Sequence, residues 1–106
     1  MFYPSANREI KIDNASRAEY WAVKLDKLMF TWFKVPQFTT FAAHFHESEQ
    51  ITYVLEGELY FEIDNETYCV KAGDCIAIPS NIEHKVWTEE TEATAVDAWS
   101  PINMRY

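Results

Sequence analysis

Short stretches that favour β-strands follow one another along nearly the whole chain, and they constrain its fold more than any other feature. Each stretch is rich in Val, Ile, Thr, Tyr, Phe or Trp, and turn residues separate it from the next. Nine stretches are expected as strands: residues 18–24, 28–34, 40–46, 51–56, 58–64, 67–71, 74–78, 84–88 and 93–99. No helix of ordinary length competes with them, so the chain is expected to be all-β.

The residues between these stretches are typical of tight turns. Asp64-Asn65-Glu66, Ala72-Gly73-Asp74 and Pro79-Ser80-Asn81 contain Asn, Asp or Gly, which tolerate left-handed conformations or hydrogen-bond to their own backbone. The middle of the chain is therefore expected to be a series of hairpins. About nine short strands form either a β-sandwich or a closed double-sheet barrel, the jelly roll, which leaves few edges exposed. The pattern alone fits both.

Length and composition indicate one globular domain that spans residues 1–106. Hydrophobic residues make up 48% of the chain, enough to form a core. Nine Lys and Arg against 17 Asp and Glu give a net charge of -8, so we expect no nucleic-acid partner, because a basic surface for phosphates is lacking. Neither a leader-like start nor a long apolar run is seen, which predicts a cytoplasmic protein that does not contact membranes.

Three histidines and a glutamine form the pattern that points to chemistry. His44 and His46 are two residues apart, so on a strand their side chains project from the same face and can chelate one ion. Gln50 opens the next expected strand and can add a neutral oxygen ligand, and a closed barrel can bring His84 over the first pair. We therefore expect one divalent metal ion at these four residues. Such ligands suit nickel, iron, zinc, manganese or copper, and the choice stays open.

The residues around these ligands resemble the two motifs of the cupin superfamily. The stretch HFHESEQITYVLEG has the spacing of the first motif, and GDCIAIPSNIEH has the residue types of the second. The resemblance implies a small cupin barrel, that is, a double-stranded β-helix or jelly roll. It also implies that His44, His46, Gln50 and His84 hold the metal ion.

The chain departs from these motifs at four positions. Phe38 stands where the first motif has a glycine, and Gln50 stands where it has a glutamate ligand. In the second motif Asn81 replaces a glycine, a change that a left-handed turn tolerates, and Thr88 replaces the closing asparagine. A neutral Gln50 leaves the double positive charge of the ion unreduced, which favours Lewis-acid chemistry over oxygen chemistry.

Within the superfamily the sequence is most similar to the small pectin-degradation cupins, which linearise unsaturated uronates. Both have a Gln ligand and a C-terminal Asp-x-aromatic-Ser-Pro segment, here residues 97–101. The similarity implies that Asp97 transfers a proton and that Trp99 packs against the sugar. The family's arginine after this segment corresponds to Asn103, which makes Arg105 the candidate to bind the substrate carboxylate. An edge charge that blocks aggregation is the alternative role of Asp97.

Three functions are compatible with these residues. The leading one is a Lewis-acid enzyme that opens or isomerises a small anionic sugar derivative, with Asp97 moving a proton. The second is a metal-dependent dioxygenase of an enol or aromatic substrate, and the third is a non-catalytic module that binds a small ligand. Whether the chain is an enzyme at all is therefore left open. The apolar residues Phe2, Tyr3 and Trp21 suggest a surface for a second copy, so we expect a homodimer.

Overall fold

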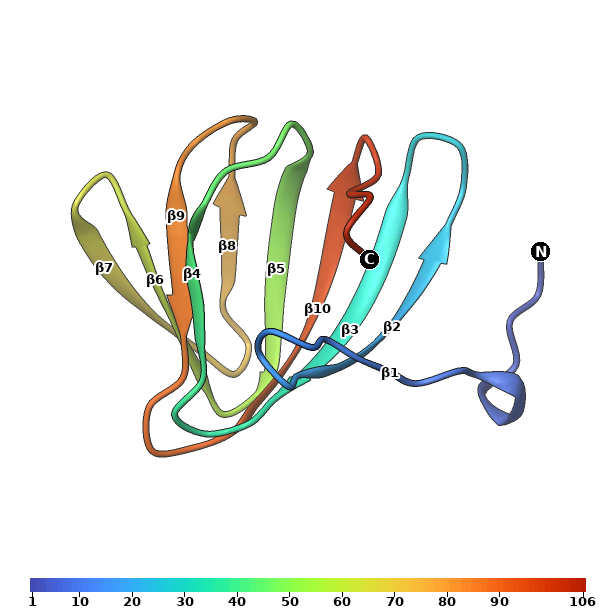
Figure 1. The fold of residues 1–106 in the computed structure, drawn as a ribbon, viewed down its shortest axis with the longest axis horizontal. Coiled ribbons are helices and arrows are strands. Elements are labelled where there is room, and N and C mark those ends of the chain that lie inside the picture. The colour runs from blue at the N-terminus through green and yellow to red at the C-terminus, as the bar shows by residue number, and fades with distance from the viewer.

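Ten β-strands and one short 3-10 helix make up the computed structural model, which describes residues 1–106 (Figure 1). The helix, η1, spans Ser5–Asn7. The strands are β1 (Lys11–Ile12), β2 (Glu19–Lys24), β3 (Met29–Val35), β4 (Thr40–His44), β5 (Glu49–Glu56), β6 (Glu58–Ile63), β7 (Glu66–Lys71), β8 (Cys75–Ile78), β9 (His84–Trp87) and β10 (Ala93–Ser100). The structure contains no helix that is long and apolar enough to cross a membrane. The all-β prediction is confirmed.

The strands form two antiparallel sheets. The six-stranded sheet has the order β1-β2-β3-β10-β5-β8, and the four-stranded sheet has the order β4-β9-β6-β7. The last strand, β10, lies between β3 and β5 and pairs with both along almost its whole length (Figure 1). This arrangement is the double-sheet jelly roll that the sequence predicted.

Alternating burial along the strands shows which side of each sheet faces the interior. Every second residue of β3 and of β10 is buried, as expected for an antiparallel sheet with one face on a core. The core is mainly aromatic and aliphatic, and its members include Tyr20, Phe33, Val54, Leu59, Phe61 and Ile78. The same alternation buries three polar side chains, those of Thr31, Thr52 and Asp97. They mark the part of the interior that carries the candidate site.

Local sequence signals predict the strands and turns closely. All nine expected strands are present, each within two residues of its expected bounds. The expected turn residues Asp64, Asn65 and Asn81 have φ values of 52°, 64° and 61°, which lie in the left-handed region. Only β1 was not expected, because a strand of two residues has too few positions to show a pattern.

Phe38 adopts the backbone conformation that a glycine would adopt at its position. Its φ is 53°, and its side chain is exposed. Hydrogen bonds from the segment after β9 hold this turn, since the Phe38 N–H donates to the Glu89 carbonyl and the Thr88 hydroxyl donates to the Pro36 carbonyl at 2.6 Å. The Thr88 hydroxyl also accepts from the Thr39 N–H at 3.0 Å. Two departures from the cupin motifs thus meet here, since Thr88 holds the turn that contains Phe38, and this turn still leads into β4.

Gly57 joins β5 to β6 where a side chain does not fit. Its φ is 74°, and a Cβ atom there would collide with the backbone carbonyl oxygen of Glu92, just before β10. Gly73 also has a positive φ, 93°, but a Cβ atom there would meet open space. An alanine would adopt a strained left-handed backbone at both positions, but it would collide with another segment only at position 57.

Gly57→Ala is expected to lower the free energy of unfolding by about 3 kcal/mol or more, because it combines a left-handed alanine with a collision against backbone. Gly73→Ala is the matched control and should lower it by only about 1–2 kcal/mol, the strain alone. Urea unfolding of both variants and the wild type measures the difference. Equal losses would contradict the close approach of Gly57 to Glu92.

Candidate metal centre

The four predicted ligands come from three strands and one turn. His44 ends β4 and is paired with His84, the first residue of β9. Gln50 lies on the inner face of β5, and both Gln50 and His84 are buried. His46 was expected on a strand but lies in the turn after β4, because the pairing with β9 becomes irregular after Phe41 and ends at His44.

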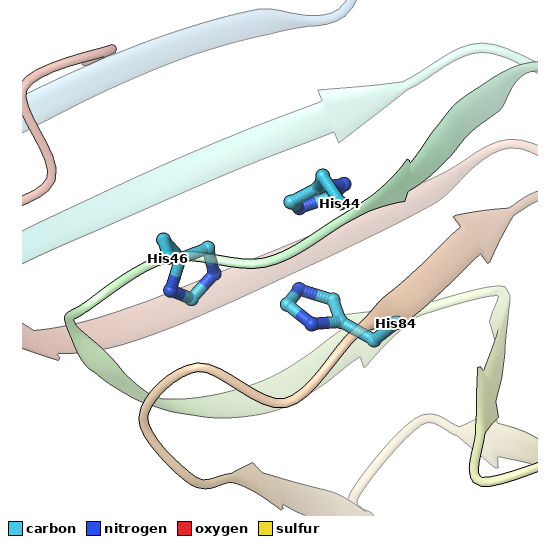
Figure 2. A group of neighbouring side chains, drawn as sticks. All are labelled: His44, His46 and His84. Carbon is cyan, nitrogen blue, oxygen red and sulfur yellow. The ribbon is translucent and has the colours of Figure 1, made fainter.

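The rings of the three histidines nevertheless converge (Figure 2). Ring centroids are 5.7 Å apart for His44 and His46, 4.4 Å for His44 and His84, and 4.9 Å for His46 and His84. One nitrogen from each ring lies within 4.8 Å of the other two. Nitrogens that share a metal ion at about 2 Å each lie up to about 4 Å apart. The histidine nitrogens are thus close to the spacing that a shared ion requires.

Backbone carbonyls determine which nitrogen of each ring faces the centre. The Nδ1 atoms of His44, His46 and His84 contact carbonyl oxygens two residues away, those of Ala42, Ser48 and Ile82, at 2.7, 2.8 and 2.8 Å. Because a carbonyl oxygen only accepts, each Nδ1 carries the proton, and the Nε2 lone pair of each neutral ring is free. Metal-binding histidines are commonly oriented by such a hydrogen bond.

Three of the four expected ligand atoms are buried and have no hydrogen-bond partner. They are Nε2 of His46, Nε2 of His84 and Oε1 of Gln50. A buried acceptor left without a partner typically costs about 1–3 kcal/mol. One divalent transition-metal ion would satisfy all three atoms, and neutral nitrogen and oxygen donors suit such ions. The residues present therefore fit a metal ion.

Burial keeps two of the histidines neutral. It lowers the pKa of His84 to about 4, although the hydrogen bond to the Ile82 carbonyl acts in the opposite direction. Burial also lowers the pKa of His44, and the charge of Arg105 contributes in the same direction. Both rings are consequently uncharged at pH 7, which is the form of imidazole that binds metal.

Asp97 lies on the inner face of the six-stranded sheet, where it is 5% exposed. Its cross-strand neighbours are Thr31 on β3 and Thr52 on β5, and the hydroxyl of each donates to its carboxylate. The Gln50 amide Nε2 donates to the Thr52 hydroxyl at 2.9 Å and to Asp97 Oδ1 at 3.4 Å. Because β10 is paired on both sides, the alternative role of Asp97 as an edge charge is wrong.

The environment of Asp97 suits proton exchange. Burial raises its pKa to about 6, while the hydrogen bonds from Thr52, Thr31 and Gln50 act to lower it. A carboxyl group with such a pKa can give or take a proton near neutral pH. The Gln50 side chain connects this group to the histidines, since its Nε2 faces Asp97 and its Oε1 is the unpartnered buried acceptor.

Trp99 lines a cavity beside the histidines. Its ring lies 5.3 Å from that of His46, and its indole N–H donates to the Thr31 hydroxyl at 2.8 Å. The cavity measures about 480 Å³ with its open mouth included, and Asp97 is the only carboxylate on its wall. Most of the wall is aromatic or aliphatic and includes Phe33, Phe41, Phe61, Val86, Trp99 and Tyr106. Trp99 therefore belongs to a largely apolar chamber.

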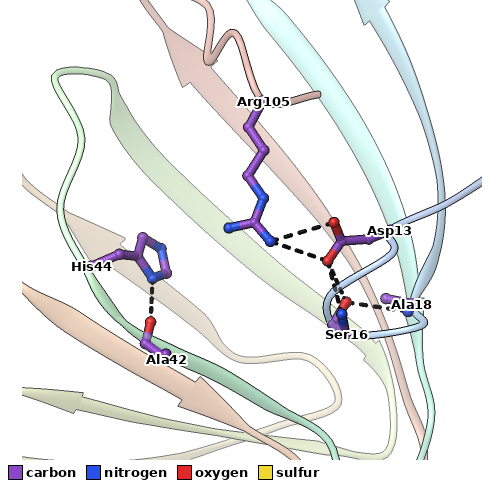
Figure 3. A network of polar contacts seen from close by, with 6 residues as sticks. All are labelled: Asp13, Ser16, Ala18, Ala42, His44 and Arg105. Carbon is purple, nitrogen blue, oxygen red and sulfur yellow. Dashed lines mark hydrogen bonds and ion pairs between the residues drawn. The ribbon is translucent and has the colours of Figure 1, made fainter.

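Arg105 does not line this cavity, because it pairs with Asp13 (Figure 3). Its Nη2 lies 3.2 Å from Asp13 Oδ2, and its side chain is 44% exposed. Asp13 also accepts hydrogen bonds from the backbone N–H and the hydroxyl of Ser16. The guanidinium expected to bind a substrate carboxylate is thus held by a carboxylate of the protein itself.

Sequence reasoning did not identify Thr31, Thr52, Asp13 or Tyr106 as neighbours of the site. Thr52 follows Gln50 by two residues, so strand alternation was a usable signal for its position. The other three come near the site only through pairing and contacts between distant segments, and these leave no signal in local spacing.

His84→Ala is expected to lose most of the bound metal while the barrel stays folded, because it removes a ligand and leaves the apolar core intact. After incubation with divalent ions, elemental analysis should find about one equivalent per chain in the wild type and at least about 10-fold less in the variant. Glu83→Ala changes the exposed neighbour and should keep the metal. Metal retained by His84→Ala, or absent from the wild type, would contradict the assignment.

Asp13→Asn tests the pair with Arg105. Burial acts to raise the pKa of Asp13, but hydrogen bonds from Ser16 and the charge of Arg105 together lower it below 3.8. A carboxyl group whose pKa is lower in the folded state stabilises the fold above its unfolded pKa, and this contribution is lost as the pH falls through the folded value. Because water screens the exposed guanidinium, Asp13→Asn should lower the unfolding free energy at pH 7 by only about 1 kcal/mol.

The difference between Asp13→Asn and the wild type should shrink as the pH falls from 7 through the folded pKa of Asp13, because protonation leaves both side chains at this position uncharged. Urea unfolding at a series of pH values measures it, with the exposed Asp26→Asn as a control that should show no such change. A loss of stability that does not depend on pH would mean that the charge of Asp13 is unimportant.

Curated proteins are similar to part of the chain. The acireductone dioxygenase of Phaeosphaeria nodorum is 34% identical over 75 residues, which cover 59% of this chain and 43% of that protein. The acireductone dioxygenase of Heterostelium pallidum is 32% identical over 75 residues, covering 59% of this chain and 51% of that protein. The chain thus spans about half the length of these relatives.

Solved structures match nearly the whole chain at low sequence identity. An RmlC-like cupin from Shewanella frigidimarina has a TM-score of 0.86 at 23% identity, over 97% of this chain and 92% of that one. KdgF from Halomonas sp. has a TM-score of 0.84 at 21% identity, over 98% and 96%. The polyketide cyclase RemF from Streptomyces resistomycificus has a TM-score of 0.81 at 21% identity, over 96% and 80%. At these identities the likeness establishes the fold alone.

A family model described as the Cupin domain matches residues 31–99, more than half of the 106-residue chain. The matched segment includes all four candidate ligands, together with Asp97 and Trp99. The two curated relatives described above are acireductone dioxygenases and not pectin-degradation cupins, so the narrower likeness expected from the sequence is not what they support. The chain belongs to the cupin domain family.

Proposed function

We propose that this chain is a metal-dependent enzyme that uses dioxygen to oxidise a small enol or enediol substrate. The observation that carries the proposal is the convergence of three histidine nitrogens and the unpartnered Gln50 oxygen beside an open cavity. The similarity to acireductone dioxygenases supports oxygen chemistry. The sequence alone favoured sugar isomerisation and gave the dioxygenase as the alternative, so the proposal reverses the ranking of these two functions.

His44, His46 and His84 would hold the ion through Nε2, and Gln50 would hold it through Oε1. A divalent transition-metal ion bound there supplies Lewis acidity and, if it is redox-active, electron transfer to dioxygen. All four ligands are neutral in this arrangement, so no protein charge offsets that of the ion. An anionic substrate such as an enolate is therefore favoured over a neutral one.

Asp97 is the cavity group suited to move a proton. Its carboxyl group lies beside Gln50, and the hydroxyls of Thr31 and Thr52 fix its orientation through hydrogen bonds. With a pKa raised to about 6, the carboxylate form is present at pH 7 and is more basic than an ordinary aspartate. It would accept the hydroxyl proton of an enol bound next to Gln50.

The walls of the cavity favour a substrate with an apolar part. Phe33, Phe61 and Val86 lie on the wall, and Trp99 lies next to the histidines. A sugar acid would turn several hydroxyl groups toward these side chains, and unpaired polar groups are costly to bury. Since Arg105 is already paired with Asp13, the cavity also lacks a free cation for a distal carboxylate.

Lewis-acid isomerisation of an anionic sugar derivative is the second candidate. The contact between Gln50 and Asp97 favours it, because a proton-transfer group lies beside a neutral ligand. In this function Trp99 would pack against the sugar ring, and Arg105 would have to exchange Asp13 for the substrate carboxylate. Such a reaction consumes no dioxygen, so one assay separates the two candidates.

Oxygen uptake with a model reductone tests the proposal. The metal-free protein is loaded in turn with Fe(II), Ni(II), Mn(II) or Zn(II), and the loss of substrate absorbance and of dioxygen are recorded together. At least one redox-active ion should give equal losses of both. His84→Ala should abolish turnover, whereas Asp97→Asn, which keeps the ligands, should retain the metal and lower kcat about 10²-fold or more.

Two results would overturn the dioxygenase proposal. One is that the protein loaded with each of the ions consumes reductone faster than a protein-free control with the same ion, but takes up no oxygen. The other is turnover of an unsaturated uronate under anaerobic conditions, which would select the second candidate.

A further inference from the structure

One residue on the wall of the cavity comes from outside the β-strands. Of the 14 residues that line the cavity, all except Tyr106 lie on the six strands β3, β4, β5, β6, β9 and β10. The ladders of hydrogen bonds between paired strands keep these other side chains in place. Tyr106 is therefore the wall residue whose position the two sheets do not fix.

The Tyr106 ring packs against three aromatic rings on the inner side of the six-stranded sheet. After β10 the chain turns back, and residues 101–106 run beside β10 and β3 (Figure 1). The centroid of the Tyr106 ring lies 5.2 Å from that of Tyr20, 4.9 Å from that of Phe33 and 5.9 Å from that of Trp99. The first two contacts are edge-to-face, a favourable geometry for aromatic pairs. The ring thus connects the apolar wall to the tryptophan that lies beside the histidines.

Few polar contacts attach residues 101–106 to the barrel. Their backbone N–H groups make hydrogen bonds only within the segment, where those of Tyr106 and Arg105 donate to the carbonyl and to the side chain of Asn103. The polar contact with another segment is the ion pair between Arg105 and Asp13, at 3.2 Å. Segments with few hydrogen bonds to the rest of a protein open at a low free energy. This segment can therefore move while both sheets stay intact.

We propose that Tyr106 is a specificity-determining residue whose ring limits the length of the apolar group that a ligand in the cavity can carry. The ring contacts both Trp99, next to the histidines, and Phe33, on the apolar wall. A ligand with a short apolar group fits beside the ring, whereas a longer one has to displace it. The inference rests on the proposed function only for the chemistry of the natural substrate, because the ring lines the cavity whatever reaction takes place there.

Arg105 is a positioning residue for Tyr106, its neighbour in the chain. Its Nη2 donates to both carboxylate oxygens of Asp13, at 3.3 and 3.2 Å. The N–H and the hydroxyl of Ser16 donate to the same carboxylate, so the anchor is itself held in place. An ion pair with an exposed partner contributes little stability, which lets the segment open when a ligand enters. The pair that keeps Arg105 from a substrate carboxylate thus holds the Tyr106 ring over the cavity.

Isothermal titration calorimetry of the full chain with two phenols of different length tests the size limit. The protein is first incubated with Zn(II), which does not oxidise the probes, and is then titrated with 4-methylphenol or 4-butylphenol. Where there is room, each additional buried CH₂ group favours binding about 4-fold. The wild type should bind 4-butylphenol no more tightly than 4-methylphenol, whereas Tyr106→Ala should bind the longer phenol at least about 10-fold more tightly than the shorter one.

Two further substitutions separate the ring from the mere loss of a tyrosine. Tyr106→Phe keeps the ring and should show the wild-type preference. Tyr3→Ala is the matched control, since Tyr3 is 52% exposed and does not line the cavity, and it should also behave like the wild type. Circular dichroism should show that all variants keep the fold.

The Arg105 variants test the positioning role and do not require the ring to be removed. Arg105→Met should loosen the segment and shift the preference toward 4-butylphenol, in the direction of Tyr106→Ala. Arg105→Lys keeps a positive charge opposite Asp13 and should restore the wild-type preference. These two variants decide the question if Tyr106→Ala does not fold.

The inference is overturned if the wild type gains as much affinity from the longer phenol as Tyr106→Ala does, or if neither protein binds either phenol. An Arg105→Met variant with the wild-type preference would overturn the positioning role. Binding is measured here without oxygen uptake. A failure of the dioxygenase assay would therefore leave the size limit standing, and a failure of the size limit would leave the oxygen chemistry standing.

Discussion

Pairing of β10 with both β3 and β5 determines what the interior of this barrel contains. The inner face of β10 carries Asp97 and Trp99, and the two ladders place Thr31 on one side of Asp97 and Thr52 on the other. A carboxyl group in this position would be unfavourable if it were unpaired, and the two hydroxyls together with the Gln50 amide satisfy its oxygens. The same strand, β10, thus pairs with both neighbours in the sheet and carries Asp97 and Trp99 into the cavity.

The histidine cluster follows from the same architecture on the opposite sheet. β4 and β9 bring His44 and His84 side by side, and nearby carbonyls orient each ring so that Nε2 is free. The unpartnered nitrogens and the Gln50 oxygen are individually unfavourable in a buried position. Proteins tolerate such groups at functional sites, where a ligand satisfies them, and one metal ion would satisfy all of them together.

Sequence predicted the strands and the grouping of the three histidines because both follow from local patterns. Period-two alternation and turn residues located the strands, and the spacing of His44, His46 and Gln50 anticipated the cluster even though His46 lies beyond the end of β4. Contacts between distant segments were not predictable: Thr31 meets Asp97 across 66 positions, and Arg105 meets Asp13 across 92. The residues of the apolar cavity wall also come from several strands, so no local sequence pattern predicts the wall. This wall is the feature that disfavours a sugar as the substrate.

X-ray absorption spectroscopy of the metal-loaded protein tests the central claim most directly, namely that three imidazoles and the Gln50 oxygen share one ion. Loading with Ni(II) or Zn(II) should give a first shell of nitrogen and oxygen at about 2.0–2.2 Å with the outer-shell scattering of three imidazole rings. Gln50→Ala should keep the imidazole signal and lose affinity. A first shell that contains sulfur, or one with a single imidazole, would contradict the account, because the ion would then lie outside the histidine cluster.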